Sequence, residues 1–470
     1  MIFRFLLALW LAKIAMVMSK LTGKGRGSSL PGMLALRICP DILKHYSSQT
    51  GRGAIMITGT NGKTTTSNML AGALEHAGYK VINNREGANL LTGIVTSFIK
   101  ISSFTGKVSC DYAVLEVDEA AFPVVIKWIQ PRMVTITNFF RDQLDRYGEL
   151  DTTISKVVGA LKKLSADTQL VLNSDDPLVA KIAAETGYQT TYYGIRPAAE
   201  ISGRASYSRE AKFCPFCSEA LTYAVYIYSQ LGDYKCPNCG FTRPVPDIEA
   251  ASVRHRQAKT VGAVIRSGSS EWRLELPVQG LYNLYNALAA FTASIKLGLK
   301  PEVVIASLNR YLPVTGRMET FKYKNKKVIL ALVKNPTGFN QALDGLLVGD
   351  EEQDLLIAIN DNDADGRDVS WLWDVDFEIL LERQERFKRF ICTGQRAEDM
   401  AVRLKYAGVS VAQISIEKDY NLAIQAALSG ECQVISMLAT YTAVWPVEKI
   451  LSGMSERVKF SEDHGMSSVS

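Results

Sequence analysis

The feature that most constrains the fold lies at residues 54–66, where a short apolar run leads into a glycine-rich turn and then a helical pattern. The turn reads Gly59-Thr-Asn-Gly-Lys-Thr64. Backbone N–H groups of such a turn wrap an anion, and the positive end of the following helix adds to the attraction. Lys63 can reach the β- and γ-phosphates of a nucleotide, and Thr64 can hold Mg²⁺. The segment therefore predicts a strand–loop–helix unit that binds nucleotide phosphate.

The loop differs from a standard P-loop at one position. A standard loop has a glycine five residues before the second glycine. This chain has Ile57 at that position, and its first glycine comes only at Gly59. A chance glycine turn is the weaker interpretation, because a strand pattern precedes the turn and a helical pattern follows it. The narrower loop points away from generic NTPases.

The rest of the chain alternates strand patterns with helical patterns, which is typical of a mostly parallel sheet with helices on both faces. One such series covers residues 54–137 and continues at 169–173. A second series has strand patterns at residues 328–333, 355–360, 389–393 and 433–438. The 470 residues allow two or three domains. We expect an α/β protein with an N-terminal helical segment (1–50), a central P-loop domain (51–312) with an insert (203–245), a C-terminal Rossmann-like domain (313–450) and a frayed tail (451–470).

An apolar run at residues 5–12 resembles a signal peptide or a membrane span at first sight. The run is too short to cross a bilayer, Lys13 and Lys20 follow it, and no small-residue cleavage site comes after them. Export is therefore not expected. Two interpretations stay open, a helix packed on the protein and a helix resting on a membrane surface. We expect a cytoplasmic protein, with the inner face of the plasma membrane as a further option.

Four cysteines in two short pairs predict a zinc site. The pairs Cys214-Pro-Phe-Cys217 and Cys236-Pro-Asn-Cys239 are separated by the eighteen residues 218–235, a spacing typical of a Cys₄ site. The tyrosine-rich segment at 221–231 can form the hairpin that joins them. Disulfides and a redox motif are weaker alternatives. We expect an inserted zinc ribbon with a structural Zn²⁺.

The same insert raises the possibility of nucleic-acid binding. Its basic residues are few and are offset by acids, and the formal net charge of the whole chain is only +5. No basic stripe with interleaved aromatics of the kind used for single strands is visible. We therefore expect no nucleic-acid partner.

Three further segments are expected beside the phosphate loop if the sheet is wound as above. The strand pattern at 113–119 ends in Glu116, Asp118 and Glu119, and a carboxylate at the end of such a strand can complete a Mg²⁺ shell. A solvated turn would explain Glu119 but not Glu116, which lies within an apolar run. Polar residues also follow the strand pattern at 133–137, and Asn283 and Asn286 open a helix.

Together these residues resemble the Mur ligase family of ATP-dependent amide-bond ligases, which includes the folylpolyglutamate synthetases. The resemblance rests on four motifs in order: the loop at 58–64, the Leu-Glu-Val-Asp-Glu strand at 115–119, Thr137-Asn138 with Asp142 and Asp145, and the Asn-X-X-Asn-Ala-Leu-Ala-Ala helix at 283–290. It implies ATP and Mg²⁺ as cofactors. It implies nucleotide binding by Gly59, Thr60, Asn61, Gly62, Lys63, Thr64, Thr65, Asn89, Asn283 and Asn286.

Within this set the resemblance implies particular roles. Thr64 and Glu116 would bind Mg²⁺, Lys63 would bind phosphate, and Asn89 and Asn286 would lie near adenine. Arg317, in a Thr-Gly-Arg-Met-Glu segment, would approach the γ-phosphate from the last domain.

The chain departs from the common pattern of the family in several places. Only about fifty residues precede the phosphate strand, so the separate domain that holds the UDP end of nucleotide-linked precursors is not expected. Gln143 stands where the family usually has a histidine, which puts a second metal site in doubt. Ala331 stands where an acid usually contacts the ribose. The zinc insert is not a general family feature.

These departures, with the aspartate-rich run at 360–374, are similar to a branch of the family that amidates lipid II. The resemblance implies that ATP phosphorylates the α-carboxylate of D-glutamate in the stem peptide. Ammonia from a GatD-like class I glutaminase subunit then displaces phosphate, and lipid II is met at the membrane surface. Asp368 would be the third member of the glutaminase triad, orienting a histidine of the partner. Without the resemblance, Asp361, Asp363, Asp365 and Asp368 would be read as loop caps or cation ligands.

The chain is not expected to be its own glutaminase, which would need an oriented Cys–His pair. None of its four histidines, His45, His76, His255 and His464, lies in an obvious catalytic turn, and Cys392 is the only tempting nucleophile. The main alternative is a self-contained Mur or folylpolyglutamate-type ligase that adds an amino acid. A zinc-ribbon protein acting on nucleic acid is the third.

Overall fold

The computed structural model describes residues 2–22, 29–85, 88–142, 150–198, 210–256, 260–278, 280–312, 319–347 and 350–457. Arg317, Gln143, Asp145 and residues 458–470 lie outside these ranges. The described residues form two compact units. The first contains residues up to Phe140, those from 150 to 198 and those from 210 to Tyr311; the second contains Arg141, Asp142 and the residues from Leu312 onward.

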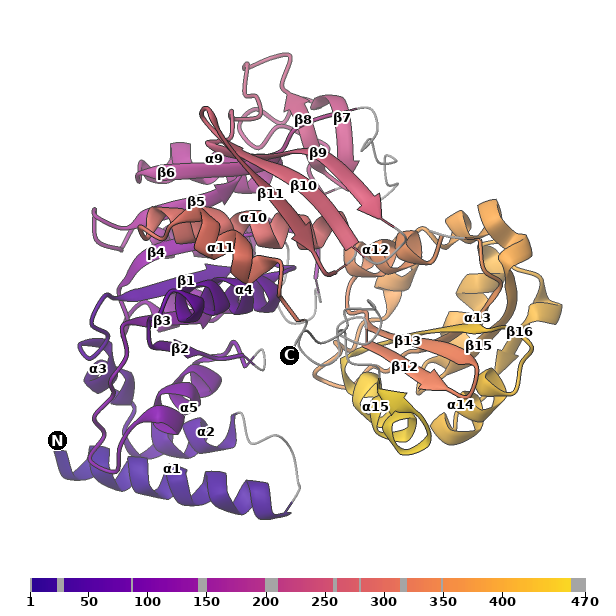
Figure 1. The fold of residues 1–470 in the computed structure, drawn as a ribbon, viewed down its shortest axis with the longest axis horizontal. Helices are drawn as coiled ribbons and strands as arrows, with labels where there is room; N and C mark the ends of the chain where they lie inside the picture. The colour runs from indigo at the N-terminus through magenta and orange to yellow at the C-terminus, as the bar shows by residue number, and fades with distance from the viewer. Residues whose placement is uncertain are drawn as a thin grey trace, which may run out of the picture. The chain divides into compact units, whose positions relative to one another are not determined.

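A nine-stranded sheet organises the first unit (Figure 1). Its strands are β1 Ala54–Thr58, β2 Val81–Asn83, β3 Tyr112–Glu116, β4 Pro131–Ile136, β5 Gln169–Asn173, β6 Thr190–Ile195, β9 Ile248–Arg256, β10 Thr260–Ser267 and β11 Ser270–Leu276. Their order is β11-β10-β9-β6-β5-β4-β1-β3-β2. The strands from β2 to β9 in this order run parallel, and β10 and β11 extend the sheet antiparallel.

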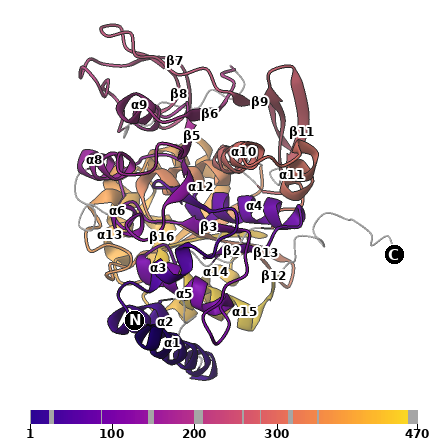
Figure 2. The ribbon, with the colours of Figure 1, turned by 90° about the vertical axis from the view of Figure 1, so that its left-hand side faces the viewer.

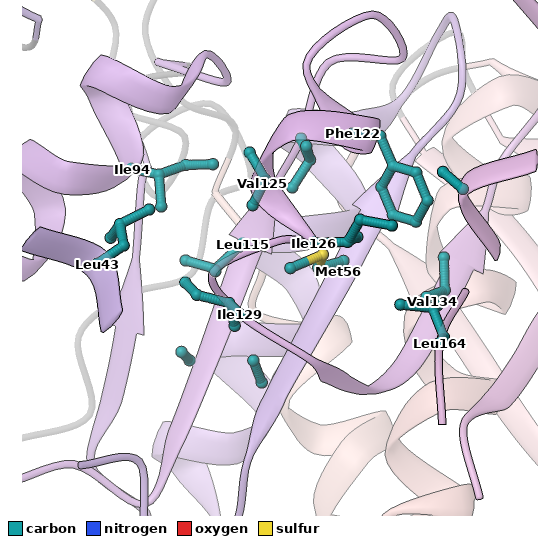
Figure 3. Packing of buried hydrophobic residues seen from close by; sticks show 14 of the residues in the cluster. Leu43, Met56, Ile94, Leu115, Phe122, Val125, Ile126, Ile129, Val134 and Leu164 are labelled. Carbon is teal, nitrogen blue, oxygen red and sulfur yellow. The ribbon is translucent and has the colours of Figure 1, made fainter. Parts of the chain in front are cut away.

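Helices cover both faces of this sheet, so its central strands are apolar along their whole length. Ile55 and Ile57 of β1 contribute to one core, and Met56 contributes to the other. The face of Ile55 is covered by α4 Lys63–His76, α10 Leu281–Lys296 and α11 Pro301–Leu308. The face of Met56 is covered by α5 Leu91–Ile101, α6 Phe122–Val125, α8 Leu150–Leu161 and α9 Pro177–Thr186. Figure 3 shows Met56 packed with Leu115 and Phe122 in this second core.

Three N-terminal helices, α1 Ile2–Thr22, α2 Leu30–Ile38 and α3 Ile42–Ser47, complete the second core. Helix α1 lies beside α2 at the edge of the unit (Figure 2). By length and composition alone, its residues Ile2–Ser19 suffice to cross a membrane. The apolar stretch is thus longer than the run at residues 5–12, because the helix continues past Lys13 on apolar residues.

The insert contains an antiparallel hairpin made of β7 Thr222–Tyr228 and β8 Leu231–Lys235. This is the hairpin predicted between the two cysteine pairs. The following ribbon, β9 to β11, was not predicted. In β11, Glu271, Arg273 and Glu275 alternate with apolar residues, so the continuous apolar pattern does not mark that strand.

A seven-stranded sheet organises the second unit, in the order β16-β15-β14-β17-β13-β12-β18. Its strands are β12 Glu319–Tyr323, β13 Lys326–Leu332, β14 Gln353–Ala358, β15 Phe387–Thr393, β16 Ile414–Ile416, β17 Val434–Ala439 and β18 Glu456–Arg457. The first five strands in this order are parallel, and β12 and β18 are antiparallel additions. The helices are α12 Pro336–Leu347, α13 Ala397–Tyr406, α14 Tyr420–Leu428 and α15 Tyr441–Met454, with 3₁₀ helices η2 Ser370–Asp374, η3 Phe377–Arg386 and η4 Val411–Gln413.

The predicted α/β class, with two parallel-rich sheets and an inserted cysteine module, is confirmed. The predicted frayed tail begins too early, however. Helix α15 continues to Met454 because Leu451 is fully buried in the core of the second unit, and the short strand β18 then pairs with β12.

Candidate functional site

The phosphate loop lies where the strand order of the first sheet reverses. Strand β1 has β3 on one side and β4 on the other, and the chain leaves β1 through α4 to reach β2 beyond β3. Ligands of open parallel sheets bind at the carboxyl ends of strands beside such a switch point. In the register of the sheet, Glu116 of β3 pairs with Ile57, and Ile136 of β4 pairs with Thr58. Polar residues that end three neighbouring strands therefore meet at this edge.

Two glycines give the loop its shape. Gly59 has φ 116° and Gly62 has φ 83°, both in the left-handed region that favours glycine. A Cβ atom at Gly59 would overlap the Thr137 hydroxyl, and one at Gly62 would overlap the side-chain oxygen of Asn286. Gly62 is also the N-cap of α4, so the loop delivers the chain directly to the positive end of that helix.

Hydrogen bonds from the end of β4 fix the backbone of the loop. The Asn61 N–H donates to Asn138 Oδ1 at 2.9 Å, and Asn138 Nδ2 donates to the Asn61 carbonyl at 3.1 Å. The Thr137 hydroxyl donates to the same carbonyl at 2.8 Å. The Thr60 hydroxyl donates to the Phe140 carbonyl at 3.1 Å. The predicted Thr137-Asn138 motif thus positions the phosphate loop.

Lys63 is buried among carboxylates in the first turn of α4. Its Nζ lies 3.0 Å from Glu119 Oε2 and donates to the Thr60 carbonyl at 3.1 Å. Burial lowers the pKa of Lys63, but Glu119, Asp118 and Glu116 raise it by more, so its pKa lies above the ordinary value. The site therefore holds a permanent positive charge beside the loop.

Glu119, one of the three candidate acids at the end of this strand, pairs with Lys63, and the sequence did not predict that pairing. Its alternative assignment to a solvated turn is wrong, because only 6% of Glu119 is exposed and its carboxylate pairs with Lys63. The pair joins residues 56 positions apart. The order of residues along the strand gave no signal for it.

Glu116, the predicted Mg²⁺ ligand, is held rigidly at the end of β3. Its N–H donates to Asn84 Oδ1 at 2.9 Å, and Asn84 Nδ2 donates back to the Glu116 carbonyl at 2.8 Å. Asn89 Nδ2 donates to Glu116 Oε1 at 3.2 Å. The other carboxylate oxygen, Oε2, is buried and has no hydrogen-bond partner among the described residues. A buried carboxylate oxygen is costly unless it is paired or ligates a metal, so Glu116 fits the role of a Mg²⁺ ligand.

The remaining predicted residues surround the loop from other elements. Thr64 and Thr65 are buried in the first turn of α4. Asn286 of α10 accepts from the Thr66 hydroxyl at 3.3 Å, and its amide donates to Asn283 Oδ1 at 3.3 Å. The structure thus brings Asn286 to the phosphate loop and Asn89 to Glu116. Contact of either with adenine stays a prediction, as does the γ-phosphate role of Arg317, which lies outside the described residues.

The four predicted cysteines converge on one point in the insert. The Sγ atoms of Cys214, Cys217, Cys236 and Cys239 all lie within 4.8 Å of one another. Two of the separations, Cys214–Cys239 and Cys217–Cys236, are 3.5 Å. A tetrahedral Zn²⁺ with Zn–S bonds of about 2.3 Å places its sulfurs roughly 3.8 Å apart, so these thiols fit a zinc ion. All four are free cysteines.

The tip of the cysteine hairpin reaches the phosphate site through a buried glutamine. Gln230, between β7 and β8, is fully buried, and its Nε2 donates to the Phe139 carbonyl at 2.6 Å. The same amide donates to Asp176 Oδ1 at 3.3 Å, and the Phe139 N–H donates to Asp176 Oδ2 at 2.9 Å. Phe139 directly follows Asn138, which braces the loop. The cysteine module is therefore connected to the phosphate loop through Phe139 and Asn138.

A second buried polar cluster fastens the base of the module. Asp175 is fully buried and accepts from Arg243 Nε at 2.7 Å and from the Tyr285 hydroxyl at 2.6 Å. Burial lowers the pKa of Arg243, but Asp175 raises it by more, and the guanidinium stays charged. Because Tyr285 adjoins Asn286 on α10, this cluster also reaches the helix that touches the loop.

We expect Gln230→Ala to weaken ATP binding as well as stability. The substitution leaves the Phe139 carbonyl and Asp176 without this amide donor, which costs about 1–3 kcal/mol per unsatisfied buried group. The segment that braces the loop then loses its support, so the Kd for ATP should rise several-fold, as measured by calorimetry beside thermal unfolding. The matched control is Thr222→Ala, whose hydroxyl bonds only to Lys235 within the hairpin. Equal ATP affinity in the two variants would contradict the connection.

The aspartate-rich loop of the second unit follows β14. Asp365 is buried and accepts from the Thr442 N–H at 2.7 Å, so it caps the start of α15. Asp361 pairs with Arg396 at 2.8 Å, and Asp363 pairs with Arg367 at 2.7 Å. These three acids have structural partners within the unit.

Asp368 differs from its neighbours in this loop. It is exposed, and its Oδ1 accepts the Ser370 N–H at 2.8 Å. An Asx turn of this kind holds the side chain in one orientation while the carboxylate stays accessible. Within the described ranges, the cysteine cluster alone has three or more grouped metal ligands, so a cation site in this loop is not supported.

The other cysteines do not have the properties of nucleophiles. Burial raises the pKa of Cys392 to about 12 and that of Cys110 to about 11. Burial is also the main cause that raises the pKa values of Cys39 and Cys432, each to about 11. A nucleophilic thiol needs a lowered pKa, and Cys392 is therefore core.

Comparison with known proteins supports the motif-based resemblance. A family model described as Mur ligase middle domain matches residues 57–239, and one described as MurT ligase C-terminal matches residues 332–444. The pseudomurein peptide ligase type C from Methanothermus fervidus has a similar fold, with TM-score 0.67 and 23% identity, covering 88% of this chain and 81% of that one. The MurF ligase from Thermotoga maritima, solved in complex with ADP, has TM-score 0.62 and 13% identity, covering 89% and 84%.

A nearer relative is the Staphylococcus aureus MurT subunit of lipid II isoglutaminyl synthase (glutamine-hydrolysing). It is 38% identical over 417 residues, which are 88% of this chain and 90% of the relative. At this identity and coverage, the chain belongs to the MurT branch of the Mur ligase family.

Proposed function

We propose that this chain is the ATP-dependent synthetase subunit that amidates the D-glutamate α-carboxylate of the lipid II stem peptide to D-isoglutamine, with ammonia from a class I glutaminase partner. The observation that carries the proposal is the 38% identity to a named MurT subunit across nearly the whole chain. The phosphate loop, with its buried lysine and carboxylates, supplies the groups that the ATP-dependent half of the reaction requires.

The reaction proceeds in two displacements. A carboxylate oxygen of D-glutamate attacks the γ-phosphorus of ATP, and the bond to the bridging oxygen breaks to release ADP. Ammonia then attacks the carbonyl carbon of the acyl phosphate, the bond to the phosphate oxygen breaks, and the amide nitrogen loses a proton. The first step activates a carboxylate that does not react with an amine unaided. The second requires that water be kept from the acyl phosphate.

Residues of the first unit neutralise the charge that moves in the first step. Lys63 contacts the β- and γ-phosphates, and the N–H groups of residues 59–64 together with the start of α4 hold the phosphate chain. Thr64 and Glu116 would hold Mg²⁺, which supplies further positive charge at the phosphates when bound. Asn89, Asn283 and Asn286 complete the nucleotide site, and the family resemblance assigns Arg317 to the γ-phosphate. The four cysteines would hold a structural Zn²⁺.

The ammonia comes from a second, GatD-like subunit. Cys392 is buried with a raised thiol pKa, and the other described cysteines outside the four-cysteine cluster have raised pKa values too, so they supply no candidate nucleophile. In this proposal the exposed carboxylate of Asp368 orients the histidine of the partner, since a triad carboxylate acts by holding the imidazole tautomer and stabilising its charged form. The enzyme works in the cytoplasm, at the inner face of the plasma membrane, where its lipid-linked substrate lies.

One experiment tests the whole proposal. The chain is purified with and without a co-expressed class I glutaminase and is given lipid II, ATP and glutamine, and the product is examined by mass spectrometry. We expect amidated lipid II only when the glutaminase is present. Equal product from glutamine without the glutaminase would overturn the two-subunit proposal. ADP formation that depends on an added amino acid and not on glutamine would indicate a self-contained ligase.

A further inference from the structure

Helix α1 is apolar on two opposite faces, but the fold uses only one of them. Phe5, Ala8, Leu9 and Ala12 are buried in the core beside α2 and α5. The spacing of these residues is that of a single helical face. The inner face thus attaches α1 to the first unit.

The outer face of α1 exposes large apolar side chains from Ile2 to Met18. Phe3 is 78% exposed and Val17 is 58% exposed. The full set on this face is Ile2, Phe3, Leu7, Trp10, Leu11, Ile14, Val17 and Met18. Contiguous exposed apolar patches of this kind mark interaction sites in soluble proteins.

The patch extends onto the loop that follows α5. Trp10 Nε1 donates to the Phe104 carbonyl at 2.8 Å, and the Phe104 side chain is itself 75% exposed. Lys13 lies 5.5 Å from the centre of the Phe104 ring, and its Nζ donates to the Ile99 carbonyl at 2.9 Å and to the Ser102 carbonyl at 2.6 Å. These hydrogen bonds hold α1 against the end of α5 and the loop after it. Figure 2 shows α1 at the outer edge of the first unit.

Positive charge is concentrated on the same part of the chain. Residues 1–50 contain seven lysines and arginines and one acid, Asp41, while the formal net charge of the whole chain is +5. The remaining residues are therefore close to neutral. In the described structure Arg4, Arg37 and Lys44 are exposed on α1 to α3, and Lys100 and Lys107 are exposed beside them at the end of α5 and in its loop.

We propose that the outer face of α1, with Phe104, is a docking surface for an anionic lipid bilayer. The helix lies in the interface with its outer side chains among the acyl chains and the neighbouring lysines and arginines at the lipid headgroups. It lies flat and does not cross the bilayer, because its inner face is buried in the core and Lys13 is bonded to carbonyl groups at the end of α5. The inference rests on the proposed function in one respect, since a lipid-linked substrate explains why the enzyme needs this surface.

A flotation assay with the full-length chain tests the proposal. Vesicles of phosphatidylglycerol with phosphatidylcholine, and of phosphatidylcholine alone, are the probes. We expect binding to the anionic vesicles that weakens on addition of salt, and weaker binding to the neutral ones. The triple variant Phe3→Ser/Trp10→Ser/Ile14→Ser should bind roughly 100-fold less tightly, because each exposed apolar side chain contributes to insertion. An unchanged thermal midpoint shows that the variant is folded.

The matched control removes equally exposed apolar side chains elsewhere, as Val245→Ser/Tyr406→Ser/Val411→Ser, and should bind vesicles like the natural chain. Equal binding by both triple variants would overturn the proposal. So would a concentration-dependent dimer that the α1 variant disperses without any vesicle binding by the natural chain, which would assign the face to a second copy. Vesicle binding without amidation of lipid II would reject the proposed function and leave the docking surface standing.

Discussion

Replacing Lys63 by methionine should lower ATP-dependent amidation by at least roughly 10²–10³-fold, the loss found when one preorganised charge-stabilising group is removed from an active site. Lys63 carries the positive charge closest to the loop, and its raised pKa keeps it protonated at every working pH. Methionine keeps an unbranched apolar side chain only one atom shorter than lysine while removing the charge. The measurement is the initial rate of amidated lipid II in the glutaminase complex, with added ammonium salt as nitrogen donor so that only the synthetase half is tested.

This variant also has a structural cost, which needs its own control. Lys63 is buried against Glu119, and removing one member of a buried ion pair costs about 3–5 kcal/mol because the other charge stays uncompensated. The double variant Lys63→Met/Glu119→Gln removes both charges and should recover most of the lost free energy of unfolding. Its amidation rate should stay as low as that of Lys63→Met. Recovery of activity together with stability would show that Lys63 acts through the fold and not on the phosphates.

The sequence predicted the phosphate loop because its determinants are local. A strand, two glycines with left-handed φ and the start of a helix follow one another within a dozen residues, and each has its own pattern. The residue pattern indicated Glu116 and Asn286, the resemblance to the Mur ligases gave them roles, and the structure places both beside the phosphate loop. The strands that are buried on both faces, such as β1 and β3, could also be predicted, because each is a continuous apolar run in the sequence.

What could not be predicted depends on contacts between distant residues. Gln230 is one polar residue in a tyrosine-rich hairpin, and nothing near it indicates that its amide bonds to Phe139, 91 positions away. Asp175 and Asp176 lie in the polar sequence Ser174-Asp-Asp-Pro177, which gives no sign of burial, yet both are fully buried. Burial of a polar group is decided by the partners that the fold brings to it, and a single sequence does not show these partners.

The second large effect concerns the aspartate-rich loop. We expect Asp368→Asn to abolish glutamine-dependent amidation, by up to roughly 10⁴-fold as for a triad carboxylate, while amidation from ammonium salt is retained. Asparagine keeps the shape and the acceptor for the Ser370 N–H, so the loop should be preserved. It does not stabilise the charged imidazole of a partner histidine. The two nitrogen donors are compared in the same complex, and co-purification of the subunits is checked for each variant.

The same loop provides a matched control five residues earlier, at Asp363. Asp363 is exposed and pairs with Arg367, a surface pair worth about 0–1 kcal/mol. Asp363→Asn removes an equal charge from the same surface and should leave both activities intact. If Asp368→Asn also keeps its glutamine-dependent activity, the carboxylate is not part of a triad. If it loses both activities, Asp368 serves the synthetase site or the fold, because a group that acts only on the partner's histidine cannot affect a reaction supplied with free ammonia.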